Sequence, residues 1–334
     1  MTMFKDIPED TKAVIFSLSG PVLTAEETAL FAAAKPLGFI LFDKDGARNI
    51  QNPQQLRALI KSLKDCVGWN CPILIDQEGG RVQRMKAPHW RAYPPGKVFG
   101  DQAAEETLEA ALESLRFNTL QMADDLVEVG INVTCSPVLD LVFPGAHDII
   151  GDRAFGADPA LAGRLGLSLC RHYLAAGVTP VIKHIPGHGR AEADSHLALP
   201  RVKASHADLA AADFMPFKML SESDVGSKVW GMTAHVVYED LDADHPATTS
   251  QKVMQDIIRG EIGFAGFLLG DDLDMKALDI YGDLAARADA CLTAGCDALL
   301  YCSGRFADME LLSKSVSNLT DTARKRLQNA AFLA

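Results

Sequence analysis

Eight short apolar runs, separated by segments with helical patterning, constrain the fold of this 334-residue chain more than any other feature. Near-continuous runs of this length are typical of strands buried on both faces of a parallel sheet. The runs are AVIFSL from Ala13, GFILF from Gly38, PILID from Pro72, INVTCSPVLDL from Ile131, VTPVIKH from Val178, VWGMTAHVVY from Val229, GFLLGDD from Gly266 and DALLYC from Asp297. Eight strand–helix units predict an α/β protein with one closed TIM (β/α)₈ barrel, as a single domain over residues 1–334. An open doubly wound sheet is the alternative, but no GxGxxG motif follows the first run, which disfavours dinucleotide binding.

The segments between the runs carry helix-end signals. A capping box opens at Thr24, and Asp158 and Ser205 are expected to cap later helices. The segment Glu105–Gly130 predicts one long helix that stops at its glycine. SQKVMQDIIRG, from Ser250, predicts another helix.

Composition excludes several classes of protein. The net charge is −12 and no basic cluster is present, which disfavours nucleic acid as a partner. No apolar stretch reaches the roughly 18 residues of a membrane span. The polar N-terminus lacks the pattern of a signal peptide, so a cytoplasmic protein is expected. Seven cysteines without a CxxC pair favour reduced thiols over disulfides or a zinc site.

Polar residues cluster where the predicted strands end. Asp76 ends PILID, the pair Lys183 and His184 ends VTPVIKH, and Asp271 with Asp272 ends GFLLGDD. Reactive groups of a (β/α)₈ barrel lie at this rim, so we expect these residues to converge. Two further candidates are Arg84 and Arg153, which lie in the segments QEGGRVQR and GDRAFGADP.

Each of these residues also has a structural interpretation. Glu78 and Arg81 could form a surface ion pair in a tight turn, and Arg153 could pair with Asp152. Asp76 could cap a turn, and Asp271 with Asp272 could cap a following helix. Arg84 and Glu192 could be solvated charges, and His235 could be a hydrogen-bonded core residue. The sequence does not decide between a structural and a functional role for Asp140.

The loop KHIPGHGRAEADSHLALP, residues 183–200, concentrates titratable groups between glycines and prolines. A metal at His184, His188, Asp194 and His196 fits the ligand types, although the spacing is not HExxH. A Ser-His-Asp hydrolase centred on Ser195 is weaker, because no GxSxG motif exists.

The favoured interpretation of this loop is an acid/base pair. Residues two apart on an extended backbone project to the same side, so Asp194 could orient His196 by a hydrogen bond. His196 would then be a general acid/base, and Asp271 an ionised nucleophile or electrostatic stabiliser. An acid facing a carboxylate is the equipment of a glycosidase.

The segments IDQEGGRVQR, GDRAFGADP, KHIPGHGRAEADSHLALP and GDDLDMKAL together resemble glycoside hydrolase family 3, specifically its bacterial single-domain β-N-acetylglucosaminidases. The resemblance covers nearly the whole chain and implies a (β/α)₈ barrel and a retaining mechanism without metal or organic cofactor. It places the nucleophile on Asp271, the acid/base on His196 and the orienting carboxylate on Asp194. It places the sugar-binding contacts on Asp76, Arg84, Arg153, Lys183 and His184.

The resemblance also implies the substrate and leaves some questions open. It suggests an enzyme that removes N-acetylglucosamine from anhydro-muropeptides during cytoplasmic recycling of cell-wall fragments. The oligomeric state is left open, with a monomer favoured. Gly270 and Asp274 replace serines of the family's usual SDDLSM, which leaves fine substrate preference open. The alternatives are a phosphorylase that uses phosphate as acceptor, a metal-dependent barrel hydrolase, and a non-catalytic sugar-binding protein.

Overall fold

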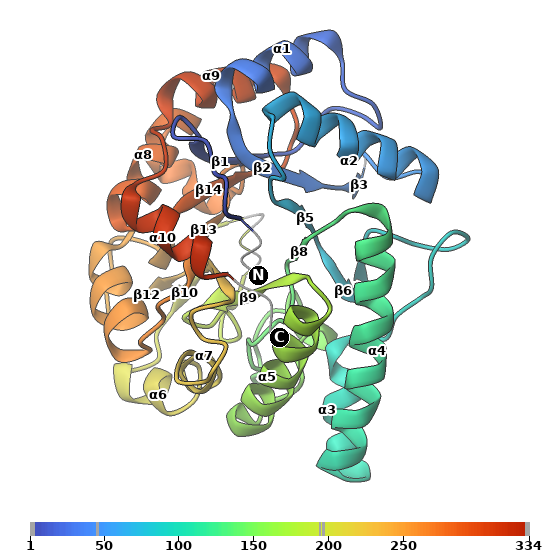
Figure 1. The fold of residues 1–334 in the computed structure, drawn as a ribbon. Helices are drawn as coiled ribbons and strands as arrows, with labels where there is room; N and C mark the ends of the chain where they lie inside the picture. The colour runs from blue at the N-terminus through green and yellow to red at the C-terminus, as the bar shows by residue number, and fades with distance from the viewer. Residues whose placement is uncertain (1–3, 45–46, 194, 196–197, 331–334) are drawn as a thin grey trace.

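The computed structural model describes residues 4–44, 47–193, 195 and 198–330. Its centre is a closed barrel of eight parallel strands in the order β1-β14-β13-β11-β9-β8-β5-β2 (Figure 1). The barrel strands are β1 (Lys12–Phe16), β2 (Pro36–Leu41), β5 (Ile73–Ile75), β8 (Val133–Thr134), β9 (Thr179–Ile185), β11 (Trp230–Thr233), β13 (Phe267–Asp272) and β14 (Ala298–Tyr301). Each strand overlaps one of the eight predicted runs, so the (β/α)₈ prediction is confirmed.

Helices surround the barrel and bury their apolar sides against it (Figure 1). The α-helices are α1 (Ala25–Ala34), α2 (Pro53–Val67), α3 (Gly96–Glu105), α4 (Leu108–Val129), α5 (Pro159–Ala175), α6 (His206–Ala211), α7 (Met215–Ser221), α8 (Leu284–Ala294), α9 (Phe306–Ser315) and α10 (Asp321–Asn329). Shorter turns are the 3₁₀ segments η1 (Gly151–Arg153), η2 (Ala247–Thr249) and η4 (Lys276–Tyr281). No helix in the described part of the chain is both long and apolar enough to cross a membrane.

Among the described residues, three pairs of short strands lie outside the barrel sheet. They are β3 (Asp43–Lys44) with β4 (Ala47–Arg48), β6 (Gln77–Gly79) with β7 (Val82–Gln83), and β10 (Arg201–Val202) with β12 (Val237–Tyr238). The β6–β7 pair is antiparallel and follows β5 directly. This hairpin therefore stands at the carboxyl end of a barrel strand, where the polar residues were expected.

Most predicted helix ends are confirmed, with one correction. Thr24 accepts a hydrogen bond from the Glu27 N–H in a complete capping box, and Asp158 and Ser205 cap α5 and α6. The helix predicted from Glu105 is wrong at its start, because Thr107 accepts from the Ala110 N–H and begins α4 as a separate helix.

The segment after Ser250 is helical as predicted but is wound as a π-helix, η3 (Val253–Glu261). Its apolar residues Val253, Met254, Ile257 and Ile258 are buried. The prediction of a helix is therefore confirmed, and the winding of that helix was not predicted.

Candidate active site

The carboxyl ends of the barrel strands surround a pocket that contains most of the predicted site. Its polar lining comprises Asp76, Glu78, Arg84, Arg153, Lys183, His184, Asp271, Asp272 and Cys302. Its apolar wall comprises Ile40, Phe42, Val82, Ile149, Met232, Met275 and Leu300. Polar groups that converge against an apolar wall are typical of a binding site for a small polar ligand. The structure thus brings Asp271 and all five predicted sugar contacts to one place.

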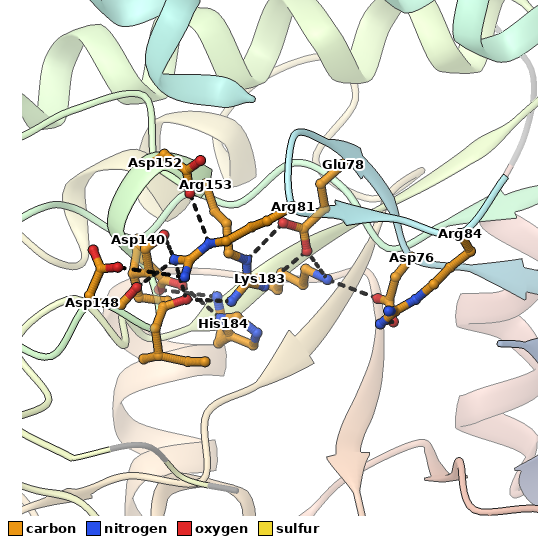
Figure 2. A network of polar contacts seen from close by, with 12 residues as sticks. Asp76, Glu78, Arg81, Arg84, Asp140, Asp148, Asp152, Arg153, Lys183 and His184 are labelled. Carbon is orange, nitrogen blue, oxygen red and sulfur yellow. Dashed lines mark hydrogen bonds and ion pairs between the residues drawn. The ribbon is translucent and has the colours of Figure 1, made fainter. Parts of the chain in front are cut away.

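Lys183 is the centre of the charged network in this pocket (Figure 2). Its Nζ lies 3.1 Å from Asp76 Oδ1 and 2.6 Å from Glu78 Oε1, and its side chain is almost fully buried on β9. Glu78 in turn receives both arms of the Arg153 guanidinium, with Nε to Oε2 at 2.8 Å and Nη2 to Oε1 at 2.9 Å. A bidentate contact of this kind fixes the orientation of the carboxylate and the guanidinium as well as pairing their charges.

Arg84 completes the network on the side of β2. Its Nη2 donates to Asp76 Oδ2 at 3.1 Å, and its guanidinium carbon lies 5.0 Å from the centre of the Phe42 ring. The backbone N–H of Arg84 donates to Gln77 Oε1 at 2.9 Å. This hydrogen bond holds the residue after β7 against the first strand of the β6–β7 hairpin. The predicted alternative of a solvated Arg84 is therefore wrong.

The charges of the network determine its protonation. Burial would raise the pKa of Asp76, but Lys183 and Arg84 hold that pKa well below its ordinary value. Burial would also raise the pKa of Glu78, and Arg153 and Lys183 lower it instead. Burial would lower the pKa of Lys183, whereas Glu78 and Asp76 raise it. Both carboxylates and the ammonium are consequently charged at neutral pH, and the site is a fixed array of ions.

Sequence reasoning missed the role of Glu78. The expected surface pair with Arg81 is wrong, because Arg81 Nε contacts Asp152 Oδ1 at 2.9 Å while Glu78 faces the pocket. Arg153 likewise pairs with Glu78 instead of its neighbour Asp152. A signal was present, since Glu78 lies two residues after Asp76 in extended chain and such residues share a side.

Asp140, which the sequence left ambiguous, organises the start of the loop 183–200. Its Oδ1 accepts from the backbone N–H groups of His184 and His188, at 3.1 and 2.6 Å. Its Oδ2 lies 2.6 Å from His184 Nδ1 (Figure 2). Burial would raise the pKa of Asp140, but His184 lowers it. Asp140 therefore sets the direction of the His184 ring, which leaves the other ring nitrogen for the pocket.

Asp271 and Asp272 are the last residues of β13, and both line the pocket. Asp271 Oδ1 accepts from the Asp272 N–H at 2.8 Å. Asp272 Oδ1 accepts from the N–H groups of Cys302 and Asp274, at 3.0 and 3.2 Å. Burial, aided by the charges of Asp271 and Asp274, raises the pKa of Asp272 to about 6 although these N–H groups lower it. The capping alternative is wrong, because η4 begins at Lys276 without a side-chain cap.

The two departures from the family's usual motif lie beside the pocket. Asp274 accepts from Ser303 Oγ at 2.5 Å and from Arg305 Nη2 at 2.8 Å, and it is outside the pocket lining. At Gly270 an added Cβ would meet Thr248 and Cys296 at ordinary contact distances of 3.5 and 3.6 Å. A Cβ atom would therefore fit at position 270, and the charge at position 274 is already paired.

The predicted acid/base pair cannot be placed in the same way. Asp194 and His196 lie outside the described residues, so their roles stay predictions. Within the described part of the chain, no group of three or more His, Cys, Asp or Glu side chains is arranged to hold a metal ion. The metal site considered from the sequence includes Asp194 and His196, so the search of the described residues does not test it.

The remaining expectations concern residues in the core. His235 is buried, with Nδ1 2.7 Å from Thr248 Oγ1 and Nε2 3.1 Å from the Asp272 carbonyl oxygen. The interpretation as a hydrogen-bonded core histidine is confirmed. All seven cysteines lie in the described part of the chain, and no disulfide joins any two of them there.

Comparisons with known proteins agree with this geometry. The model of the glycosyl hydrolase family 3 N-terminal domain matches residues 23–332. A β-hexosaminidase of Aromatoleum aromaticum is 35% identical over 98% of this chain and 90% of its own length. A β-hexosaminidase of Pseudomonas aeruginosa is 36% identical over 95% and 90%. The crystal structure of NagZ from Neisseria gonorrhoeae in complex with N-trifluoroacetyl-D-glucosamine has a TM-score of 0.86 and 32% identity, over 97% of this chain and 91% of that one. The chain therefore belongs to glycoside hydrolase family 3 and is a glycoside hydrolase.

Proposed function

We propose that this protein is a retaining exo-β-N-acetylglucosaminidase that removes terminal N-acetylglucosamine from cell-wall-derived muropeptides in the cytoplasm. The observation that carries the proposal is the single pocket in which Asp271 faces the same space as Asp76, Arg84, Arg153, Lys183 and His184. The β-hexosaminidase relatives and the N-trifluoroacetyl-D-glucosamine complex of the similar NagZ support an aminosugar as the ligand.

The ion network suits recognition of sugar hydroxyls. A carboxylate offers about four lone-pair sites, and Asp76 uses one on each oxygen for Lys183 and Arg84. Its other lone pairs remain for hydroxyl groups of a sugar. Because the two cations keep Asp76 ionised, it accepts hydrogen bonds over the whole physiological pH range.

The proposed reaction is a double displacement. Asp271 attacks the anomeric carbon while protonated His196 donates its proton to the leaving oxygen, which gives a covalent glycosyl-enzyme. Neutral His196 then removes a proton from water, and the water oxygen replaces Asp271 on the same carbon. The configuration at that carbon is retained, and Asp194 orients the imidazole during both steps.

Replacing His196 by alanine should separate the two steps. We expect kcat/KM to fall on the order of 10²–10⁴-fold for phenyl β-N-acetylglucosaminide, whose leaving group needs a proton. The loss should be much smaller for the 4-nitrophenyl substrate, because nitrophenolate leaves without one. Initial rates with both substrates measure this. Equal losses on the two would contradict the assignment of His196.

The same assay distinguishes the alternatives. Products are compared with and without phosphate, and N-acetylglucosamine 1-phosphate as the main product would identify a phosphorylase instead of a hydrolase. Activity that disappears on chelation and returns with zinc would support the metal-dependent alternative. Release of the α-anomer, observed by NMR before mutarotation, would contradict retention.

A further inference from the structure

Ser195 is the described residue between Asp194 and His196, and the protein holds it from two sides. Its side chain is buried, and its Oγ lies 3.1 Å from His188 Nε2. Its carbonyl oxygen accepts from the Ala277 N–H at 3.3 Å. Ala277 lies in η4, the segment that follows β13 and Asp271. Ser195 thus joins the loop of the predicted acid/base to the segment that follows the strand of the predicted nucleophile.

His188 is itself fixed in place. Its backbone N–H donates to the buried Asp140, and a Cβ on the next residue, Gly189, would lie 2.0 Å from the Leu141 carbonyl oxygen. The Tyr238 hydroxyl donates to the carbonyl oxygen of Gly187 at 2.6 Å. These contacts hold His188 in a fixed position beside Ser195.

The ring of His188 is uncharged near neutral pH. Burial, together with His184, lowers the pKa of His188 to about 4. Its Nδ1 is buried and has no hydrogen-bond partner among the described residues. The contact with Ser195 is thus between two neutral groups and does not titrate near neutral pH.

A serine–histidine nucleophile pair is a different interpretation of the same distance. It requires a carboxylate on the second ring nitrogen and an exposed hydroxyl. In the described part of the chain Nδ1 has no such partner, and Ser195 is only 3% exposed. The geometry fits a structural hydrogen bond and not a nucleophile.

We propose that the His188–Ser195 hydrogen bond positions His196 for proton transfer, so that both are positioning residues of the reaction. The proposal rests on the proposed function. One peptide bond separates Ser195 from each member of the predicted acid/base pair, so a shift of Ser195 moves both. A displacement of 1 Å in a catalytic group can cost on the order of 10²-fold in rate.

Ser195→Ala tests the proposal because it removes one hydroxyl and leaves the backbone contact to Ala277 possible. We expect kcat/KM on phenyl β-N-acetylglucosaminide, which reports the first step alone, to fall ~10-fold to ~10²-fold. The fall in kcat/KM on the 4-nitrophenyl substrate should be under ~3-fold, because that leaving group does not need the acid.

Further variants separate positioning from general damage. His188→Ala should show the same split between substrates, and His188→Gln, whose amide N–H could reach Ser195, should restore part of the lost rate. The double variant Ser195→Ala/His188→Ala should be no worse than the poorer single variant, because the two residues act through one bond. Ser221→Ala, which removes a hydroxyl bonded within α7 at 2.8 Å, is the matched control and should behave as wild type.

Two outcomes would overturn the proposal. Equal losses on both substrates with a lower melting temperature would show a role in folding alone. Wild-type rates in Ser195→Ala would show that the bond positions nothing. Both presuppose an active wild-type enzyme, so failure of the proposed function would be recognised separately, as wild type inactive on either substrate.

Discussion

Asp271→Ala should lower kcat/KM for 4-nitrophenyl β-N-acetylglucosaminide by about 10⁴-fold or more, as expected when a covalent nucleophile is removed. The carboxylate lies at the end of β13, where pairing of Leu269 with Ala298 and of Asp272 with Leu300 holds the backbone on both sides of a register irregularity. No flexible segment therefore has to bring the nucleophile into the pocket. The loss should be as severe for this activated substrate as for the phenyl substrate, in contrast to His196→Ala, because both need an attacking group.

The control for this variant is a second carboxylate close in sequence. Asp279 pairs with Arg287 at 2.8 Å and is largely exposed, so Asp279→Asn should retain wild-type activity. Thermal denaturation of both variants shows whether either has lost the fold. An Asp271→Ala enzyme that is folded and retains a tenth or more of the wild-type rate would remove Asp271 from the role of nucleophile.

The barrel could be predicted because its signal is local. Each of the eight strands overlaps a run such as GFILF or DALLYC, whose apolar side chains must be buried on both faces. The position of Asp76, Lys183 and Asp271 follows from the same pattern, since each lies at the end of such a run. Once the topology is known, residues at strand ends meet at the rim whatever their separation in sequence.

The partners of these residues could not be predicted, because pairing depends on distances between elements. Glu78 looked like the partner of Arg81 in a turn, yet the β6–β7 hairpin directs it toward Lys183 on β9. Asp140 had no distinguishing neighbour in sequence, and its role appears only when β8 and β9 lie side by side. Local sequence patterns thus predicted where the strands end, but they did not predict which side chains of different elements form ion pairs or hydrogen bonds.

Replacing Glu78 should lower the free energy of unfolding more than replacing any other single residue of the site. Its carboxylate contacts Lys183 and Arg153, and all three side chains are at most 10% exposed. Removing one partner of a buried ion pair costs about 3–5 kcal/mol, because the remaining charge is left without compensation. We expect Glu78→Gln to lower the free energy of unfolding by about that amount, measured from urea denaturation.

Glu128 provides the matched control, since it pairs with Arg57 at 2.8 Å on the surface with 62% of its side chain exposed. Exposed pairs contribute about 0–1 kcal/mol, so Glu128→Gln should have little effect. Adding Arg153→Met to Glu78→Gln should recover part of the loss, because it removes the charge that Glu78→Gln leaves unpaired. Equal effects of the two glutamine variants would mean that burial of the network contributes nothing.

The pH dependence gives an independent check on the same residue. The pKa of Glu78 lies below its ordinary value of 4.5, because Arg153 and Lys183 outweigh the effect of burial. A carboxylate with a lowered pKa in the folded state stabilises the protein fully above its unfolded pKa, and this contribution is lost as the pH falls through the folded value. The difference in stability between wild type and Glu78→Gln should therefore be constant at neutral pH and shrink below about pH 4.5. A difference that stays constant under acid conditions would show that the variant acts through packing and not through charge.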